Sequence, residues 1–350
     1  MTDFHRKLQW GRRAALCALV ALVLIAGGAV AAAAGETDVK AQIDKQALDA
    51  KKEGMRLYGI RWRSVAIPHL EKAAEAGDVE SMYTLGEIHR FMDRGMSREA
   101  IDWYHRAALG GDPHAMLRLE WGMICELADI CAEDHDSWVD KALEQELPRA
   151  EKGDPEAMST LFDVYNMLGE PRTALEWLER AAEAGNPEAQ DWLGTITQER
   201  SDEWPPPLED VKAAEPWFRK AAEQGYAPAM NKLSKNLRRQ ERFGEAWTWA
   251  QDAADHGHVD SRFSIAWCHL DPSLGEEEGN PFCQVEEDRI TGWAMLHAMN
   301  EETRAWAPRT LMEQERHRLT EKEIQEAERR AGQWLDQEPP MSKFPPKYGF

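Results

Sequence analysis

The sequence has too little positive charge for a typical nucleic-acid-binding protein. Its 350 residues include 42 lysines and arginines against 63 aspartates and glutamates, and the formal net charge is −21. Contacts to phosphates need clustered lysine and arginine side chains, so this balance argues against nucleic acid as a partner. We interpret the acidity as a solvated outer surface that keeps the protein soluble.

Motifs that carry chemistry are also missing. The chain has no Ser-x-x-Lys, Gly-x-Ser-x-Gly or His-Glu-x-x-His pattern, and no glycine-rich phosphate loop precedes a lysine. Carboxylates are numerous, but they fall on helical faces that we expect to be solvated, and no two stand out as an acid and base pair. We therefore expect a protein without catalytic residues, cofactor or metal.

Strand-like alternation of useful length is absent, and one short pattern recurs instead. It centres on a glycine that closes an Ala-Ala-x-x-Gly core or a close variant of it. A small residue stands four positions after each glycine, and leucine or isoleucine stands eight positions after it. A spacing of 32 to 42 residues between copies is typical of a helical solenoid. The glycines are Gly77, Gly111, Gly153, Gly185, Gly225 and Gly257.

Each copy is typical of two antiparallel helices. In most copies a tryptophan precedes the first alanine of the pair by four residues, which puts ring and methyl group on one helical face. The glycine is expected to end this helix, and an aspartate or asparagine is expected to cap the next. Two such helices cannot bury their apolar faces alone, so the copies must stack. The tryptophans are Trp103, Trp177, Trp217 and Trp249, and the caps are Asp78, Asp112, Asp154 and Asn186.

Residues 1–34 resemble an export segment. Basic residues near the start are followed by an uncharged run over 14–34 that ends in small residues, as signal peptidase prefers. The run is also long enough to span a bilayer as an uncleaved inner-membrane anchor. Either interpretation places the rest of the chain outside the cytoplasm, so we expect a periplasmic protein.

The remaining chain divides into three parts. Residues 35–63 are expected to form an N-terminal capping helix, and residues 64–335 one elongated solenoid that ends in a helix opened by a Thr320–Glu323 capping box. The segment 336–350 has two proline pairs, Pro339-Pro340 and Pro345-Pro346. We expect this tail to be disordered, and a docked tail is the alternative.

Four cysteines outside the export segment form two local pairs, Cys125 with Cys131 and Cys268 with Cys283. An even number in an oxidising compartment favours disulfides, and the helix at Cys125 must end before Cys131 for the first to form. Metal binding with nearby histidines, or free thiols, are the alternatives.

The stretch from Ala189 to Gly194, Ala-x-x-x-Leu-Gly, occurs together with helices that carry Trp-x-x-x-Ala-Ala-x-x-Gly. This combination resembles the Sel-one-like repeat family, which is related to the tetratricopeptide repeats. The chain departs from the family pattern at Glu120, Phe162 and Ser234, where glycine is usual. The resemblance implies an all-α superhelix that acts as an adaptor for proteins.

The resemblance also implies which residues face a partner. If the helix after each glycine lines the concave side, as in tetratricopeptide arrays, the groove is acidic in the middle, basic at the fifth copy and aromatic near Trp121 and Trp267. The aromatic residues have an alternative role in packing between repeats. The predicted partner-binding residues are Tyr83, Glu87, Arg90, Trp121, Asp163, Asn166, Asp191, Gln198, Lys235, Arg238, Arg239, Phe263 and Trp267.

These observations favour a non-enzymatic exported scaffold that binds a protein or peptide of the cell envelope through its concave face. One alternative is an immunity protein, in which an acidic groove neutralises a basic toxin. Another is a protein that acts on the cell wall or on β-lactams, which the missing nucleophile motifs argue against.

Overall fold

A computed structural model describes residues 45–135, 137–199, 207–275, 282–335 and 337–347. The predicted export segment and residues 35–44 of the predicted capping segment lie outside these ranges. Two further stretches also lie outside them, 200–206 with Pro205 and Pro206, and 276–281 with three consecutive glutamates. Within them the fold is all-α, as the repeats predict. No described helix is long and apolar enough to cross a membrane.

Successive helices pack as neighbouring pairs. A helix over residues 45–59 precedes the first pair, and α17 (Glu321–Ala331) follows the last. The pairs are α2 (Arg63–Glu75) with α3 (Val79–Met92), α4 (Arg98–Leu109) with α5 (Pro113–Glu120), α7 (Trp138–Glu151) with α8 (Pro155–Met167), α9 (Pro171–Glu183) with α10 (Pro187–Gln198), α11 (Leu208–Glu223) with α12 (Ala227–Arg239), α13 (Phe243–Asp255) with α14 (Val259–Leu270), and α15 (Arg289–Thr303) with α16 (Trp306–Glu315).

The local rules behind these pairs are confirmed. All six repeat glycines have a positive φ, between 81° at Gly257 and 97° at Gly185, which is the left-handed conformation that ends a helix. The side chains of Asp78, Asp112, Asp154 and Asn186 accept hydrogen bonds from the first turn of the following helix. Thr320 and Glu323 form the predicted capping box.

Both predicted disulfides are present. Cys125 lies within the short helix α6 (Ile124–Ala128), which ends before Cys131 as expected. Cys268 at the end of α14 is bonded to Cys283, across a loop that contains the 3-10 turn η2 (Pro272–Gly275). Each bridge therefore restrains a long connection between two neighbouring helix pairs.

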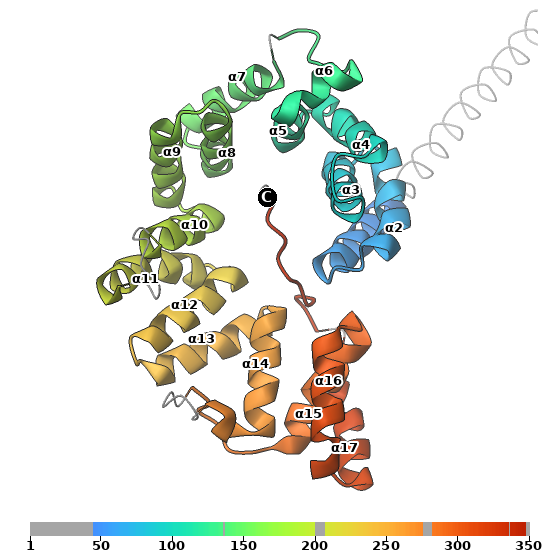
Figure 1. Cartoon of the computed structure of the whole chain (residues 1–350), viewed down its shortest axis with the longest axis vertical. Helices are drawn as coiled ribbons and strands as arrows, with labels where there is room; N and C mark the ends of the chain where they lie inside the picture. Colours follow the sequence, from blue (N-terminus) through green and yellow to red (C-terminus); the bar gives the residue numbers. More distant parts are fainter. Residues whose placement is uncertain (1–44, 136, 200–206, 276–281, 336, 348–350) are drawn as a thin grey trace, which may run out of the picture.

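The array is not elongated, which corrects the sequence-based expectation. Figure 1 shows the helices arranged around a ring, with α3, α5, α8 and α14 nearer its centre than their partners. The ends meet where the indole N–H of Trp62 donates to the carbonyl of Thr303 at 2.7 Å. Leu57 and Ile60 from the first unit share a hydrophobic cluster with Met299 of α15. The curvature of the stacked pairs has thus brought both ends together.

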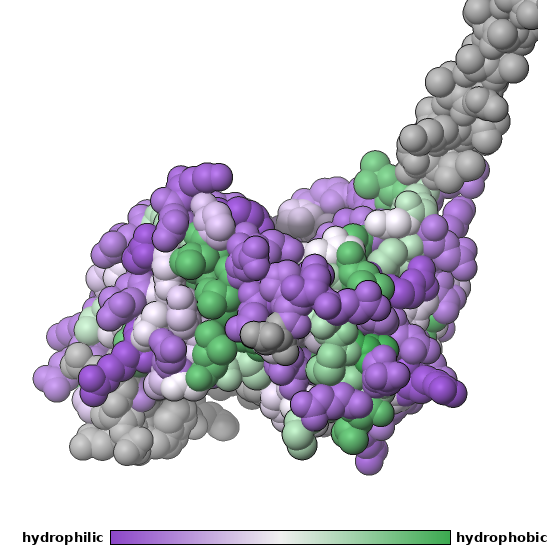
Figure 2. All heavy atoms as spheres, turned by 90° about the horizontal axis from the view of Figure 1, so that it is seen from above, coloured by the Kyte–Doolittle hydropathy of each residue, from purple (hydrophilic) through white to green (hydrophobic). Residues whose placement is uncertain are grey.

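Polar side chains cover much of the outside of the ring. Figure 2 shows one face on which hydrophilic residues predominate, with hydrophobic residues gathered in narrow bands between them. This distribution agrees with the interpretation of the acidity as a solvated surface.

The close approach of neighbouring helices can be tested at Gly194. A Cβ at Gly194 of α10 would lie 2.8 Å from the ring of Phe218 on α11, whose side chain is 1% exposed. We expect Gly194→Ala to lower the free energy of unfolding in urea by about 1–3 kcal/mol, because the buried ring has little room to move. Gly244 of α13 has no atom within 4 Å of its added Cβ and serves as the control. Gly244→Ala should leave stability unchanged or raise it by about 0.5–1 kcal/mol. Equal losses at both positions would contradict this account of packing.

Candidate functional site

The C-terminal tail runs through the middle of the ring as an extended chain (Figure 1). This finding corrects the expectation of a disordered tail for residues 337–347. The backbone N–H of Ser342 donates to the carbonyl of Gly257 at 2.8 Å, and the N–H of Val259 donates to the carbonyl of Ser342 at 3.2 Å. The N–H of Lys343 donates to the carbonyl of Gly59 at 2.8 Å. The tail is therefore bonded to the end of the helix over residues 45–59 and to the turn between α13 and α14.

Apolar contacts hold the tail at Met341 and Phe344. Met341 is 1% exposed and belongs to the same cluster as Leu57, Val259 and Met299. The ring of Phe344 stacks on His258, with centroids 5.9 Å apart and planes at 12°. The tail thus extends the hydrophobic cluster that closes the ring.

Two constraints, one on the backbone and one steric, disfavour a side chain at Gly257. Its φ of 81° disfavours other residues, and a Cβ there would clash with the carbonyl oxygen of Pro340. The repeat glycine that ends α13 therefore also leaves room for the tail.

Charged groups hold the second half of the tail. The Lys343 ammonium pairs with the Asp260 carboxylate, and Lys347 pairs with Glu156 at 3.1 Å. The hydroxyl of Tyr83 donates to the backbone carbonyl of Lys347. These partners come from α14, α8 and α3, so the tail spans the central channel, which we define as the space inside the ring that residues 337–347 cross.

Carboxylates concentrate around the place where Lys347 lies. Burial raises the pKa of Asp163 and of Glu188, and the neighbouring Glu156 raises the latter further. The imidazole of His114 is 3.6 Å from the carboxylate of Asp163 and partly offsets this effect. Burial also raises the pKa of Asp191, although Lys232 lies 2.7 Å from it. Desolvated carboxylates at neutral pH favour the arrival of a cation.

A buried network of hydrogen bonds and ion pairs lies next to Tyr83. Glu87 accepts hydrogen bonds from the Tyr104 hydroxyl and the Arg118 Nε, each at 2.7 Å, and pairs with Arg90 at the same distance. The hydrogen bonds from Arg90 and Tyr104 and the charge of Arg118 outweigh burial and lower the pKa of Glu87. Glu87 and Arg90 therefore bond to each other and to neighbouring side chains of the array.

The predicted partner-binding residues fall into three groups. Tyr83 and Asp163 contact or face the tail, and Asp191 lies in the same acidic region. Glu87, Arg90 and Gln198 bond to neighbouring side chains, as do Arg238 and Phe263, which pack against Phe282 and Trp267. Trp121 and Trp267 are 52% and 42% exposed, Asn166 and Lys235 are exposed, and Arg239 is half-buried.

Sequence reasoning missed several carboxylates that pair with the tail or lie near it. Glu156, Glu188 and Asp260 each stand three positions after a repeat glycine, in the first turn of the inner helix. The same offset gives Glu80, which pairs with Lys51 at 2.7 Å. If the repeats had been aligned on their glycines, comparing the third residue after each glycine would have found this row of carboxylates.

No group of three or more histidine, cysteine or acidic side chains is placed to hold a metal ion in the described ranges.

Comparison with known proteins identifies the repeat. The Sel1 repeat model matches residues 63–78, 79–112, 168–186 and 187–226. No curated protein matches the sequence at a significant level.

Solved structures with a similar chain path are distant in sequence. A protective antigen with an SLR fold from uropathogenic Escherichia coli is 22% identical over 83% of this chain, with a TM-score of 0.45, and the match spans 61% of that protein. A Sel1 repeat protein from Oxalobacter formigenes is 20% identical, with 67% and 95% of the two chains covered and a TM-score of 0.34. An immunity protein from Pseudomonas aeruginosa is 17% identical, with 85% of each chain covered and a TM-score of 0.40.

The buried position of His258, against the ring of Phe344, predicts that the stability of the protein depends on pH. Burial and two lysines lower the pKa of His258 to about 4, against an ordinary value of 6.5. Below pH 6.5 the unfolded chain therefore binds a proton that the folded chain does not, and stability falls as pH drops from about 6.5 to 4. We expect this loss to reach about 3 kcal/mol at pH 4.

The matched variant is His258→Asn, because asparagine can still cap α14 as the His258 Nδ1 does toward the Ser261 N–H. Urea unfolding of both proteins between pH 4 and 7 measures the difference. Parallel curves for wild type and variant would show that His258 titrates normally.

Proposed function

We propose that this chain, a protein that contains Sel1 repeats, is a scaffold that binds an extended, lysine-containing segment of a protein partner in its central channel. The observation that carries the proposal is the position of the chain's own tail, which occupies the channel as an extended peptide. The tail marks the path and the chemistry of the segment that a partner would supply.

Backbone groups in the channel would recognise an extended chain regardless of its sequence. The carbonyls of Gly59 and Gly257 and the N–H of Val259 already bond to tail backbone. This resembles strand addition to an exposed edge, in which main-chain hydrogen bonds supply affinity and side-chain pockets supply specificity.

Side-chain recognition would select cations. Asp260 and Glu156 pair with lysines four residues apart in the tail, and Asp163 and Glu188 stay partly desolvated nearby. A partner segment with a lysine in this region would relieve their mutual repulsion. Tyr83, Asp163 and Asp191 are the predicted partner-binding residues that this proposal uses directly.

The tail and a partner segment would compete for the same place. A tethered segment has an effective concentration of about millimolar, so a partner must bind well enough to displace it. The scaffold would thus remain closed to weakly binding peptides.

We place this binding in the cell envelope. The two disulfides suit an oxidising compartment, and the predicted export segment would deliver the chain there. The partner in this proposal is an envelope protein.

A reversible lock on the tail tests the proposal. A Cβ on Gly59 would lie 3.4 Å from the Cβ of Ser342, close to the separation of about 3.5–4.5 Å in disulfides. We expect the oxidised double variant Gly59→Cys and Ser342→Cys to bind a fluorescent peptide with the sequence of residues 337–350 at least about tenfold more weakly than the reduced variant. Fluorescence anisotropy measures the affinity.

Two controls accompany this measurement. Wild type with and without reductant accounts for the two native disulfides. Lys343→Glu with Lys347→Glu weakens the tail in the full chain, and we expect it to bind the peptide more tightly than wild type. Equal binding by the locked and unlocked forms would place the peptide outside the channel and refute the proposal.

A further inference from the structure

A second feature lies where the two ends of the ring meet, and it has the opposite charge to the channel. Nine residues line a pocket of about 610 Å³, and four of them are arginines while none is acidic. In a chain with an excess of acidic residues this is unusual. We call it the arginine pocket, and its lining is Arg61, Trp62, Arg63, Ser64, Val65, Phe91, Met92, Arg94 and Arg304.

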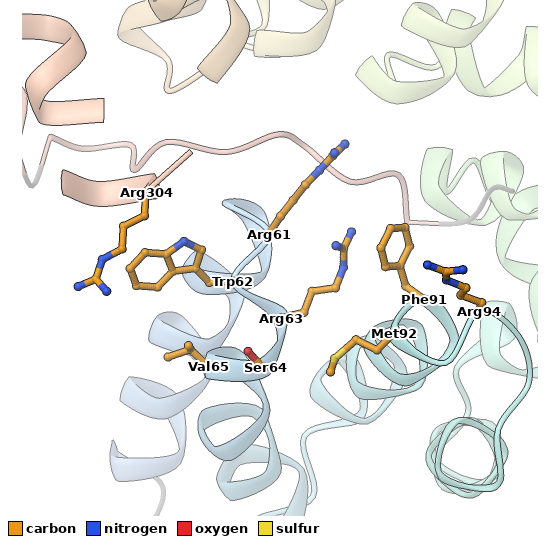
Figure 3. Close-up of a pocket in the computed structure, with 9 residues that line it drawn as sticks. All are labelled: Arg61, Trp62, Arg63, Ser64, Val65, Phe91, Met92, Arg94 and Arg304. Carbon is orange, nitrogen blue, oxygen red and sulfur yellow. The ribbon is translucent and has the colours of Figure 1, made fainter. Parts of the chain in front are cut away.

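Two of the four arginines lie against aromatic rings of the pocket. The guanidinium carbon of Arg63 lies 3.6 Å from the centroid of Phe91, and that of Arg304 lies 5.1 Å from the centroid of Trp62. None of the four has a carboxylate partner within the described ranges, whereas Arg118 and Arg242 pair with glutamates at 2.7 Å. Figure 3 shows Arg304 beside Trp62 and both Arg63 and Arg94 near Phe91, while Arg61 points away from the two rings. Guanidinium groups stacked in this way keep their N–H donors available.

Backbone conformation adds a second, independent observation. Arg61, Arg94 and Arg304 have φ values of 66°, 56° and 45°. Each follows the end of a helix, the place where the repeats use glycine at a positive φ. A residue with a Cβ is less stable in this conformation than glycine, and such strain clusters at functional sites.

The position of Arg63 is electrostatically unfavourable. It is the first residue of α2, where the positive end of the helix dipole disfavours a cation, and the first turn contains no acidic residue. Burial and the nearby Arg61 lower the pKa of Arg63, and its Nε is buried without a hydrogen-bond partner. An anion in the pocket would offset each of these effects.

Apolar surface beside the arginines indicates what else the ligand carries. Phe91 is 57% exposed, and Met92 and Val65 are each 47% exposed. Large apolar side chains next to unpaired guanidinium groups suit a peptide that alternates carboxylates with an aromatic or aliphatic residue.

From these observations we propose that the arginine pocket binds an acidic peptide segment of a partner protein through bidentate contacts from its arginines to carboxylates. An apolar residue of that segment packs on Phe91 and Met92. The lining residues come from both ends of the array, so the bound segment bridges the junction between Trp62 and Thr303. This surface is separate from the channel, and its ligand has the opposite charge.

The test uses the full-length protein and a blocked pentapeptide with two glutamates on each side of a phenylalanine, at about 0.15 M salt so that long-range repulsion is screened. Isothermal titration calorimetry measures the affinity. We expect a Kd below about 100 μM for this peptide and at least about tenfold weaker binding when glutamines replace the glutamates. A wild-type protein that binds neither peptide overturns the proposal.

The decisive variant is Arg94→Gly with Arg304→Gly. Glycine suits the positive φ at both positions, so we expect the Tm to rise by about 2 °C while the affinity for the acidic peptide falls at least about tenfold. The control Arg172→Gln with Arg180→Gln removes the same charge from exposed positions of α9 and should bind like wild type. Unchanged affinity in the glycine variant overturns the proposal. Inorganic phosphate that competes as strongly as the peptide also overturns it, because the site would then recognise a small anion alone.

Discussion

The contact between the first and last units, from the Trp62 indole to the Thr303 carbonyl, turns a row of stacked helix pairs into a ring. A helix pair in a solenoid buries its apolar face only against neighbours, which leaves both ends of an open array exposed. Here the ends cover each other, and Met341 of the tail enters the cluster between them. The channel and the arginine pocket both depend on this closure, because each draws residues from both ends of the chain.

The features that could be predicted from the sequence are local, because each depends on only a few residues that are close along the chain. Positive φ at Gly185, the Asn186 cap and the Cys125–Cys131 bridge each follow from residues within one turn or one loop. The ring does not, because its curvature is the sum of small rotations between pairs, each set by packing such as that of Gly194 on Phe218. No spacing in the sequence encodes that sum, so an elongated array was expected.

Residues of the site could be predicted only where their position in the repeat determines whether the side chain faces the inside of the ring. Tyr83 and Asp163 were found because phasing on the aliphatic residue of each inner helix identifies inward faces. Glu156 and Asp260 were missed, since carboxylates in a first helical turn are usually explained by the helix dipole. The tail was misinterpreted because its prolines exclude a helix, yet an extended chain is also what Gly59 and Gly257, from distant parts of the sequence, can bind together.

Ring closure has a consequence for how the chain reaches its native state during synthesis. Neighbouring pairs can fold as they leave the ribosome, because their contacts are local. The Trp62–Thr303 bond joins residues 241 positions apart, and the Tyr83–Lys347 bond joins residues 264 apart. The protein must therefore exist first as an open arc with Leu57 and Ile60 uncovered, until Met299 and then Met341 have been made and pack against them. Until then this apolar surface is a target for chaperones and proteases.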